Sequence, residues 1–258
     1  MKTKYKILLV ANLILFSSCS INRVYTTGSY GSLKSYTEKA HYNDKRSSSI
    51  YVSGDVSFGK HTQEAENFDD VTTLAEVKVH KRITGKHYNF YYGLGASYGV
   101  YRFTKGYEGL IQDNEKKGFY NLNLKTGLNY TMSRRIIDYR FIGLEVAYHN
   151  EFGPYQDKLS DLLKSNNSEL LIVNQKSLFS FNLYTEYVFK FSKKDALSIG
   201  FYIGDLINYK KEKNYDYSTD FSGITVGLRL DRYTINLITE SAQGSIKSTK
   251  IGLTYQLF

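Results

Sequence analysis

Hydrophobic and polar residues alternate along most of the chain after residue 49. Successive side chains of a strand point to opposite faces, so this period of two predicts β-strands with one apolar and one polar face. Ten such stretches occur, at residues 50–58, 71–79, 88–100, 120–130, 142–148, 179–189, 197–203, 224–230, 233–237 and 251–258. The last stretch needs a neighbour on each edge, because an unpaired edge leaves backbone groups without partners. We expect the first stretch to supply one of those neighbours.

The connections between these stretches alternate in length. Those at 84–86, 131–136, 192–195 and 231–232 are short, and those at 59–70, 104–118, 150–176 and 208–220 are long. Short periplasmic turns and long extracellular loops are typical of outer-membrane barrels. We therefore expect an all-β fold consisting of a single antiparallel transmembrane β-barrel of about ten strands. The even strand count predicts that both the N- and C-termini are periplasmic.

The final stretch has the composition of a closing strand. The run Ile251-Gly252-Leu253-Thr254-Tyr255-Gln256-Leu257 resembles the C-terminal strand of bacterial outer-membrane β-barrels, which reads apolar-Gly-apolar-Thr-Tyr-polar-aromatic. Leu257 stands where those proteins have an aromatic residue, and Phe258 follows it. The resemblance implies a bacterial outer-membrane location, contact with outer-membrane lipid and lipopolysaccharide, and recognition by the barrel-assembly machinery.

The first residues have the features of a targeting segment. Three lysines precede an apolar run at 7–16, which is too short to span a bilayer. Ser17-Ser18-Cys19 resembles a bacterial lipobox, which implies cleavage before Cys19 and acylation of its thiol. Ser20 resembles lipoproteins sent to the outer membrane, and Ser-Cys-Ser resembles lipoproteins of the Bacteroidota, a Gram-negative group. The absence of acids in 20–23 favours an anchor in the periplasmic leaflet, and an ordinary signal peptide remains the alternative.

These features divide the chain into three expected parts. They are a signal peptide at 1–18, a lipidated tether at 19–47 and the barrel at 48–258. The tether is expected because residues 20–47 are rich in Ser, Thr, Gly, Tyr and Lys, with little periodic apolar pattern. One helix is expected at 155–164, where the apolar residues Tyr155, Leu159, Leu162 and Leu163 recur at helical spacing. This helix would pack on the barrel rim, or serve as a lid or docking helix.

Composition and charge agree with this interpretation. Tyr (25) and Phe (15) are residues that suit strands and membrane interfaces. The mean hydropathy of −0.40 is compatible with a barrel, because only alternate residues of each strand meet lipid. The net charge is +9. No basic cluster interleaved with aromatic residues occurs, so we expect no nucleic-acid partner. A single cysteine excludes an intramolecular disulfide.

Charged residues recur on the polar faces of the strands, which would line the lumen. They are Asp55, Glu76, Lys78, Arg82, Lys125, Glu145, Glu186, Lys190, Arg229, Glu240 and Lys250. Acids and bases are nearly balanced, and buried charges require partners. We expect an internal ion-pair network that fills the lumen; an ion path or a binding cavity is the alternative.

No catalytic pattern is complete. His149-Asn150-Glu151 resembles the lipid A deacylase element in which Ser stands two residues after His, but Glu151 occupies the serine position. A carboxylate cannot replace that hydroxyl nucleophile. The Asp-x-His element of the omptin proteases is absent, and the histidines lack metal-ligand spacing, so no metal or cofactor is expected. We expect a non-enzymatic structural or interaction role with an envelope protein partner. The alternatives are a lipid-directed outer-membrane hydrolase and a tethered soluble lipocalin-like binding protein.

Overall fold

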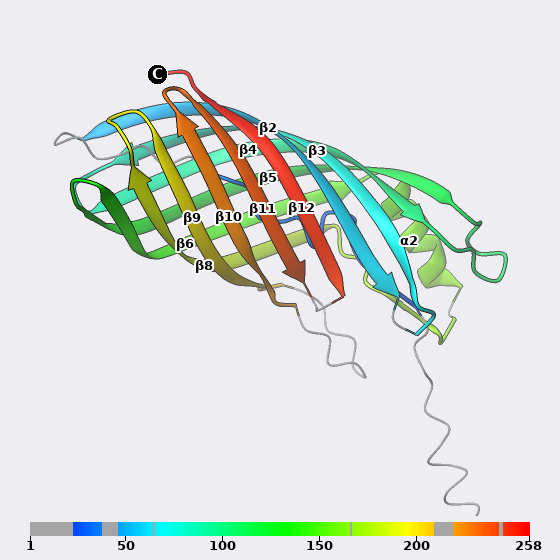
Figure 1. The fold of residues 1–258 in the computed structure, drawn as a ribbon. Coiled ribbons are helices and arrows are strands. Elements are labelled where there is room, and N and C mark those ends of the chain that lie inside the picture. Colours follow the sequence, from blue (N-terminus) through cyan, green and yellow to red (C-terminus); the bar gives the residue numbers. More distant parts are fainter. Residues whose placement is uncertain (1–22, 38–45, 64, 166, 209–218, 243–244) are drawn as a thin grey trace, which may run out of the picture.

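The structure, a computed structural model, describes residues 23–37, 46–63, 65–165, 167–208, 219–242 and 245–258. Within them, ten strands form a closed antiparallel barrel in the order β10-β11-β12-β2-β3-β4-β5-β6-β8-β9 (Figure 1). Their bounds are β2 (Ser47–Gln63), β3 (Phe68–Thr84), β4 (Tyr88–Phe103), β5 (Glu115–Ser133), β6 (Ile137–Phe152), β8 (Ser177–Lys190), β9 (Ala196–Leu206), β10 (Phe221–Leu230), β11 (Tyr233–Ala242) and β12 (Ile246–Gln256). The expected barrel is confirmed, and the last strand pairs with the first, Ile251 opposite Val56.

The apolar faces of the strands point outward. Leu94 is 60% exposed and Leu124 is 58% exposed, whereas Glu76 and Lys125 on the opposite faces are both 6% exposed. An apolar exterior around a polar lumen is the arrangement of a transmembrane barrel. A lipocalin-like barrel would have the opposite polarity, so that alternative is wrong.

On β4 and β5, two pairs of exposed tyrosines lie near the two ends of the apolar exterior, and we call these levels the two belts. Tyr88 on β4 lies opposite Tyr130 on β5, and Tyr98 lies opposite Tyr120 further along the same two strands. Ten residues separate the belts, which is about 33 Å along a strand and about 25 Å along the axis of a barrel with strands tilted near 40°. That height matches the apolar band of transmembrane barrels, whose aromatic residues gather at both interfaces.

The two ends of the barrel differ in their connections. The turn end has the connections 85–87, 134–136, 191–195 and 231–232; the loop end has the long connections 104–114, 153–176 and 207–220. The expected loop at 59–70 is wrong, because β2 continues to Gln63 and β3 begins at Phe68. Buried and exposed residues continue to alternate in these extensions, so they stay in the sheet although they lie beyond the predicted strands at 50–58 and 71–79.

A helix and a small parallel sheet lie at the loop end. The expected helix is confirmed as α2 (Pro154–Lys164), which buries Tyr155, Leu159 and Leu162 (Figure 1). β1 (Arg23–Tyr25) pairs in parallel with β7 (Leu170–Ile172). Within the described ranges, no helix combines the length and the apolar character needed to cross a membrane.

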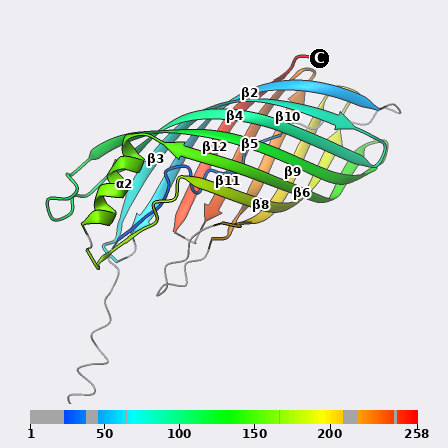
Figure 2. The ribbon, with the colours of Figure 1, turned by 180° about the vertical axis from the view of Figure 1, so that it is seen from behind.

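Residues 23–37 differ most from expectation. They belong to the expected tether, yet they run through the interior of the barrel, and all except Val24 and Ser32 are buried (Figure 2). We call residues 23–37 the lumen thread. Arg23 lies at the loop end, whereas Phe258 bonds to Ile50 at the turn end. The described chain thus starts and finishes at opposite ends of the barrel, because it crosses the lumen once before β2. The periplasmic position of both termini stays a prediction. The expected signal peptide and Cys19 lie outside the described residues.

Candidate functional site in the barrel lumen

The lumen thread folds into two consecutive turns. The N–H of Tyr30 donates to the carbonyl of Thr27, and the N–H of Ser32 donates to that of Ser29. Gly31, the third residue of the second turn, has a φ of +86°. L-residues with a side chain rarely adopt this conformation, which explains glycine at this position. A Cβ on Gly31 would also lie 2.2 Å from the Ile246 side chain, so the barrel wall packs directly against this turn.

Two glutamates of the barrel wall hold the backbone of the lumen thread. Glu151 on β6 accepts hydrogen bonds from the N–H groups of residues 28 and 29, at 2.9 and 2.8 Å. Glu240 on β11 accepts from those of residues 33 and 34, at 3.0 Å each. Each carboxylate thus binds two neighbouring N–H groups, and such charge-assisted bonds are stronger than neutral ones.

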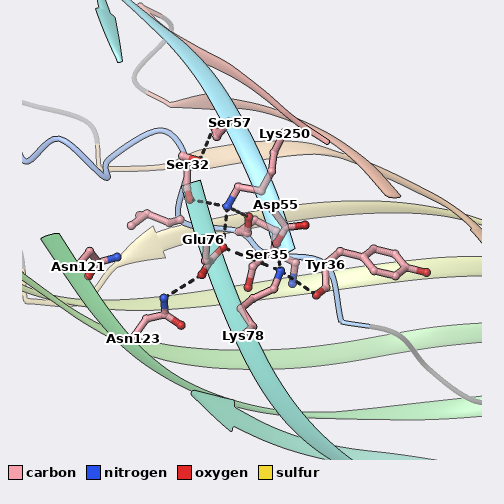
Figure 3. Close-up of polar contacts among 12 residues, drawn as sticks. Ser32, Ser35, Tyr36, Asp55, Ser57, Glu76, Lys78, Asn121, Asn123 and Lys250 are labelled. Carbon is pink, nitrogen blue, oxygen red and sulfur yellow. Dashed lines mark hydrogen bonds and ion pairs between the residues drawn. The ribbon is translucent and has the colours of Figure 1, made fainter. Parts of the chain in front are cut away.

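Two lysines of the wall hold the carbonyl groups of the same segment. Lys250 on β12 donates to the carbonyls of residues 32 and 34, at 3.1 and 3.0 Å. Lys78 on β3 donates to the carbonyl of Tyr36 at 3.4 Å. Figure 3 shows both ammonium groups directed from their strands toward the thread. Buried backbone groups need partners, and here the wall supplies them through side chains instead of a neighbouring strand.

The side chain of Lys34 extends from the lumen thread to the wall. Its Nζ lies 2.8 Å from Glu145 Oε1 and 3.1 Å from Asn182 Oδ1. The same ammonium lies 4.9 Å from the ring centre of Tyr184 and 5.5 Å from that of Tyr202. An ion pair flanked by aromatic rings gives this buried charge the partners it needs.

The turn-side part of the thread fits the wall closely. Lys125 Nζ donates to the hydroxyls of Ser35 and Thr37, at 2.8 Å each. The Tyr36 ring lies against β10, where a Cβ on Gly227 would come within 2.2 Å of the tyrosine oxygen. The glycine therefore makes room for the aromatic side chain of the thread.

The loop-side part of the thread is fixed by an arginine. Arg23 Nε lies 2.6 Å from Glu66 Oε1, and Arg23 Nη2 lies 2.9 Å from Glu66 Oε2. The guanidinium also donates to the carbonyls of Lys105 and Gly106, at 2.9 Å each. The hydrogen bonds from Arg23 lower the pKa of Glu66 to about 2. Arg23 thus joins the thread to the β2–β3 and β4–β5 connections.

The helix α2 closes the loop end over the thread. Tyr155 donates its hydroxyl proton to the carbonyl of Thr26 at 2.8 Å, and its ring stacks on Tyr101 with centres 4.5 Å apart. Further apolar residues complete this cluster: Tyr25, Leu74, Phe103, Tyr107, Ile111, Phe119, Leu159, Leu162, Leu170 and Ile172. Its members come from the thread, the wall, the β4–β5 connection, α2 and β7, so they seal the loop end as one apolar layer.

Nine of the eleven charged residues expected in the lumen are buried: Asp55, Glu76, Lys78, Arg82, Lys125, Glu145, Glu186, Glu240 and Lys250. Lys78 pairs with Asp55, and Lys250 Nζ lies 3.3 Å from Glu76. The other two, Lys190 and Arg229, lie partly exposed near the turn end.

Sequence reasoning did not find every residue of the ion-pair network in the lumen. Arg140 and Asp138 on β6 pair with Glu186 and Lys190, at 2.5 and 2.7 Å. A bulge between Arg140 and Gly143 shifts the pairing of β6 with β8, so the inward positions change from even to odd numbers. The Asp-Tyr-Arg alternation before the bulge was the available signal. The thread residues that bind the wall carry no such sequence signal, because they do so through backbone N–H groups, which every residue except proline has.

Little space remains around the thread. A hollow of about 20 Å³ lies among Lys34, Tyr184 and Glu186, which is room for about one water molecule. A larger apolar hollow of about 500 Å³ lies on the outer wall, with Val79, Leu94 and Leu124 in its lining. No group of three or more metal-binding side chains occurs among the described residues.

The element that resembles lipid A deacylases also lies inside the barrel. His149 is 5% exposed, and its Nδ1 lies 3.5 Å from the amide nitrogen of Asn121. Glu151 is engaged with the thread and with Gln156 of α2, at 2.6 Å. Both side chains therefore face the lumen and are buried near its loop end, so they are not exposed on the outer surface, where a lipid-directed hydrolase would need its site.

Comparisons with known proteins support the barrel fold and identify no protein family for this chain. No protein-family profile and no curated protein match the chain. Similar solved structures are bacterial outer-membrane β-barrel proteins. Neisserial surface protein A is 8% identical, with a TM-score of 0.34 over 81% of this chain and 98% of that one. The translocator domain of the autotransporter NalP from Neisseria meningitidis is 10% identical, with a TM-score of 0.42 over 81% and 88%. The transport unit of AIDA-I from Escherichia coli is 7% identical, with a TM-score of 0.43 over 88% and 95%. None of their activities transfers to this chain at such similarity.

Proposed function

We propose that this chain is an outer-membrane β-barrel protein with a structural or interaction role, closed by its own N-terminal segment. The lumen thread carries this proposal. Its buried residues are held by carboxylates and ammonium groups along the whole lumen. A lumen occupied in this way offers neither a wide ion path nor a cavity for a substrate, so the surfaces left for interaction are the two ends and the exterior.

The difference between the ends supports an orientation. We place the turn end in the periplasm and the loop end, with α2, outside the cell, as in barrels with short and long connections on opposite sides. Outer-membrane lipid and lipopolysaccharide would contact the apolar band, and the assembly machinery would recognise β12. The long connections would bind an envelope partner. A Bacteroidota origin and acylation of Cys19 remain predictions from the sequence.

A non-enzymatic role is part of the proposal. It is supported by the burial of His149 and Glu151 on the inner face of β6, where Glu151 binds the backbone of the thread. Mass spectrometry of lipid A from cells with and without the protein tests this part. An unchanged lipid A is expected, and a mass change that requires the protein would establish the hydrolase instead.

The closed lumen is testable by conductance. The full chain and a variant lacking residues 23–37 would be reconstituted in planar bilayers, after heat-modifiable gel mobility has shown that each is folded. The full chain should conduct little, and the deletion should open steady channels. Lys164→Ala, on the exposed side of α2, is the control and should behave as the full chain. Equal steady conductance of the full chain and the deletion would contradict a closing role of the thread.

A further inference from the structure

The direction of the lumen thread determines where the preceding chain leaves the barrel. Arg23 is held at the loop end by Glu66 and by carbonyls of the β4–β5 connection. From there the thread advances toward the turn end, where Tyr36 lies against Gly227, three residues before β10 ends. The thread therefore crosses the lumen once in a fixed direction, and the barrel wall surrounds it.

The C-terminal end of the chain lies on the other side. The N–H of Leu257 donates to the carbonyl of Ile50 at 2.9 Å, and the N–H of Ile50 donates to that of Phe258 at 3.2 Å. β2 starts at this same turn end. The entry of the thread at Arg23 and the start of β2 therefore lie at opposite ends of the barrel.

We infer that the lumen thread enters the barrel from the loop side of the membrane, opposite the C-terminus. Arg23 is fixed at the loop end, and Phe258 is bonded to Ile50 at the turn end. A tag attached directly to Arg23 should therefore be accessible from the loop side.

This inference rests on the proposed membrane barrel, because the two ends of the barrel lie on opposite sides of a membrane only if its wall spans that membrane.

The test inserts a short epitope at one of three places in the full chain. The places are between Asn22 and Arg23, at Gly109 in a loop-end connection, and between Lys193 and Lys194 in a turn-end connection. A Cβ on Gly109 would meet no atom within 4 Å, and the two lysines are exposed. Heat-modifiable mobility would establish that each variant is folded, and antibody binding to intact and permeabilised cells would then be compared.

The first two epitopes should be accessible together in intact cells, and the third only after permeabilisation. Accessibility of the Asn22–Arg23 epitope together with the Lys193–Lys194 epitope would overturn the inference. If the second and third epitopes share one accessibility, the membrane-spanning proposal itself fails. If the Lys193–Lys194 epitope alone is accessible in intact cells, the first two epitopes still share the loop side, as inferred, and the proposed orientation fails.

Discussion

Glu240 Oε2 accepts a hydrogen bond from the backbone N–H of Lys34 at 3.0 Å, although the two residues are 206 positions apart in the chain. Both residues are buried in the lumen. This contact joins the second-last strand of the barrel to a segment that precedes its first strand. Because the bond is made to the backbone, the wall can hold the thread without a matching charge on each thread side chain.

Removing the Glu240 carboxylate should loosen the thread without dissolving the barrel. Glu240→Ala leaves two buried N–H groups without this acceptor, at a cost of about 1–3 kcal/mol each. Hydrogen–deuterium exchange of peptides covering 23–37 should accelerate, and that of β4 should not change. Glu240→Gln, which keeps one carbonyl acceptor, should be intermediate, and Asp161→Ala on exposed α2 should have no effect. Unchanged exchange in Glu240→Ala would show that the carboxylate does not hold the thread.

Lys34→Met should be more harmful alone than in combination. The single change leaves the buried Glu145 carboxylate without its ion-pair partner, which costs about 3–5 kcal/mol in comparable buried pairs. Adding Glu145→Gln removes that charge and should restore part of the stability. The measurement is the temperature at which the heat-modifiable gel band unfolds. Equal midpoints for the single and double variants would contradict a coupled pair.

The contact between Arg23 and Glu66 should depend on pH. The folded-state pKa of Glu66 is lowered to about 2 from its usual 4.5, chiefly by hydrogen bonds from Arg23. The contact therefore contributes its full stabilisation above about pH 4.5 and loses it as the pH falls toward 2. The unfolding midpoint of Glu66→Gln should lie below that of the wild type at neutral pH, and the difference should vanish near pH 2. Asp161→Asn, at an exposed carboxylate, is the control. A difference that persists undiminished at pH 2 would assign the effect to packing instead of charge.

The barrel was predictable because alternation is a local property. The apolar residues of β4 and β12 occupy every second position, and this pattern alone determines which side chains share a face. The helix was predictable for the same reason, since Tyr155, Leu159 and Leu162 recur at helical spacing. The fourth apolar residue of that prediction, Leu163, is instead 49% exposed.

The lumen thread could not be predicted from its own sequence. Its partners are distant wall residues such as Glu151 and Glu240, and they bind its backbone, which carries no sequence signal. The acids and bases predicted to point inward nearly balance each other, so their charges alone do not indicate that the wall also binds a further segment of the chain. Its few apolar residues, such as Tyr30 and Leu33, follow no regular period, so the sequence alone predicts a tether.

The outward face of β12 provides the most direct test of the membrane-spanning barrel. Leu253 is 49% exposed on that face and lies opposite Gly54 and Ile235 on the neighbouring strands. An arginine near the middle of the apolar band costs about 2–4 kcal/mol in a transmembrane barrel, so Leu253→Arg should reduce the heat-modifiable species in outer-membrane fractions. Leu253→Ala removes apolar area without adding charge and should still assemble. Normal assembly of Leu253→Arg would mean that this face does not meet lipid, because water would accept the arginine at little cost.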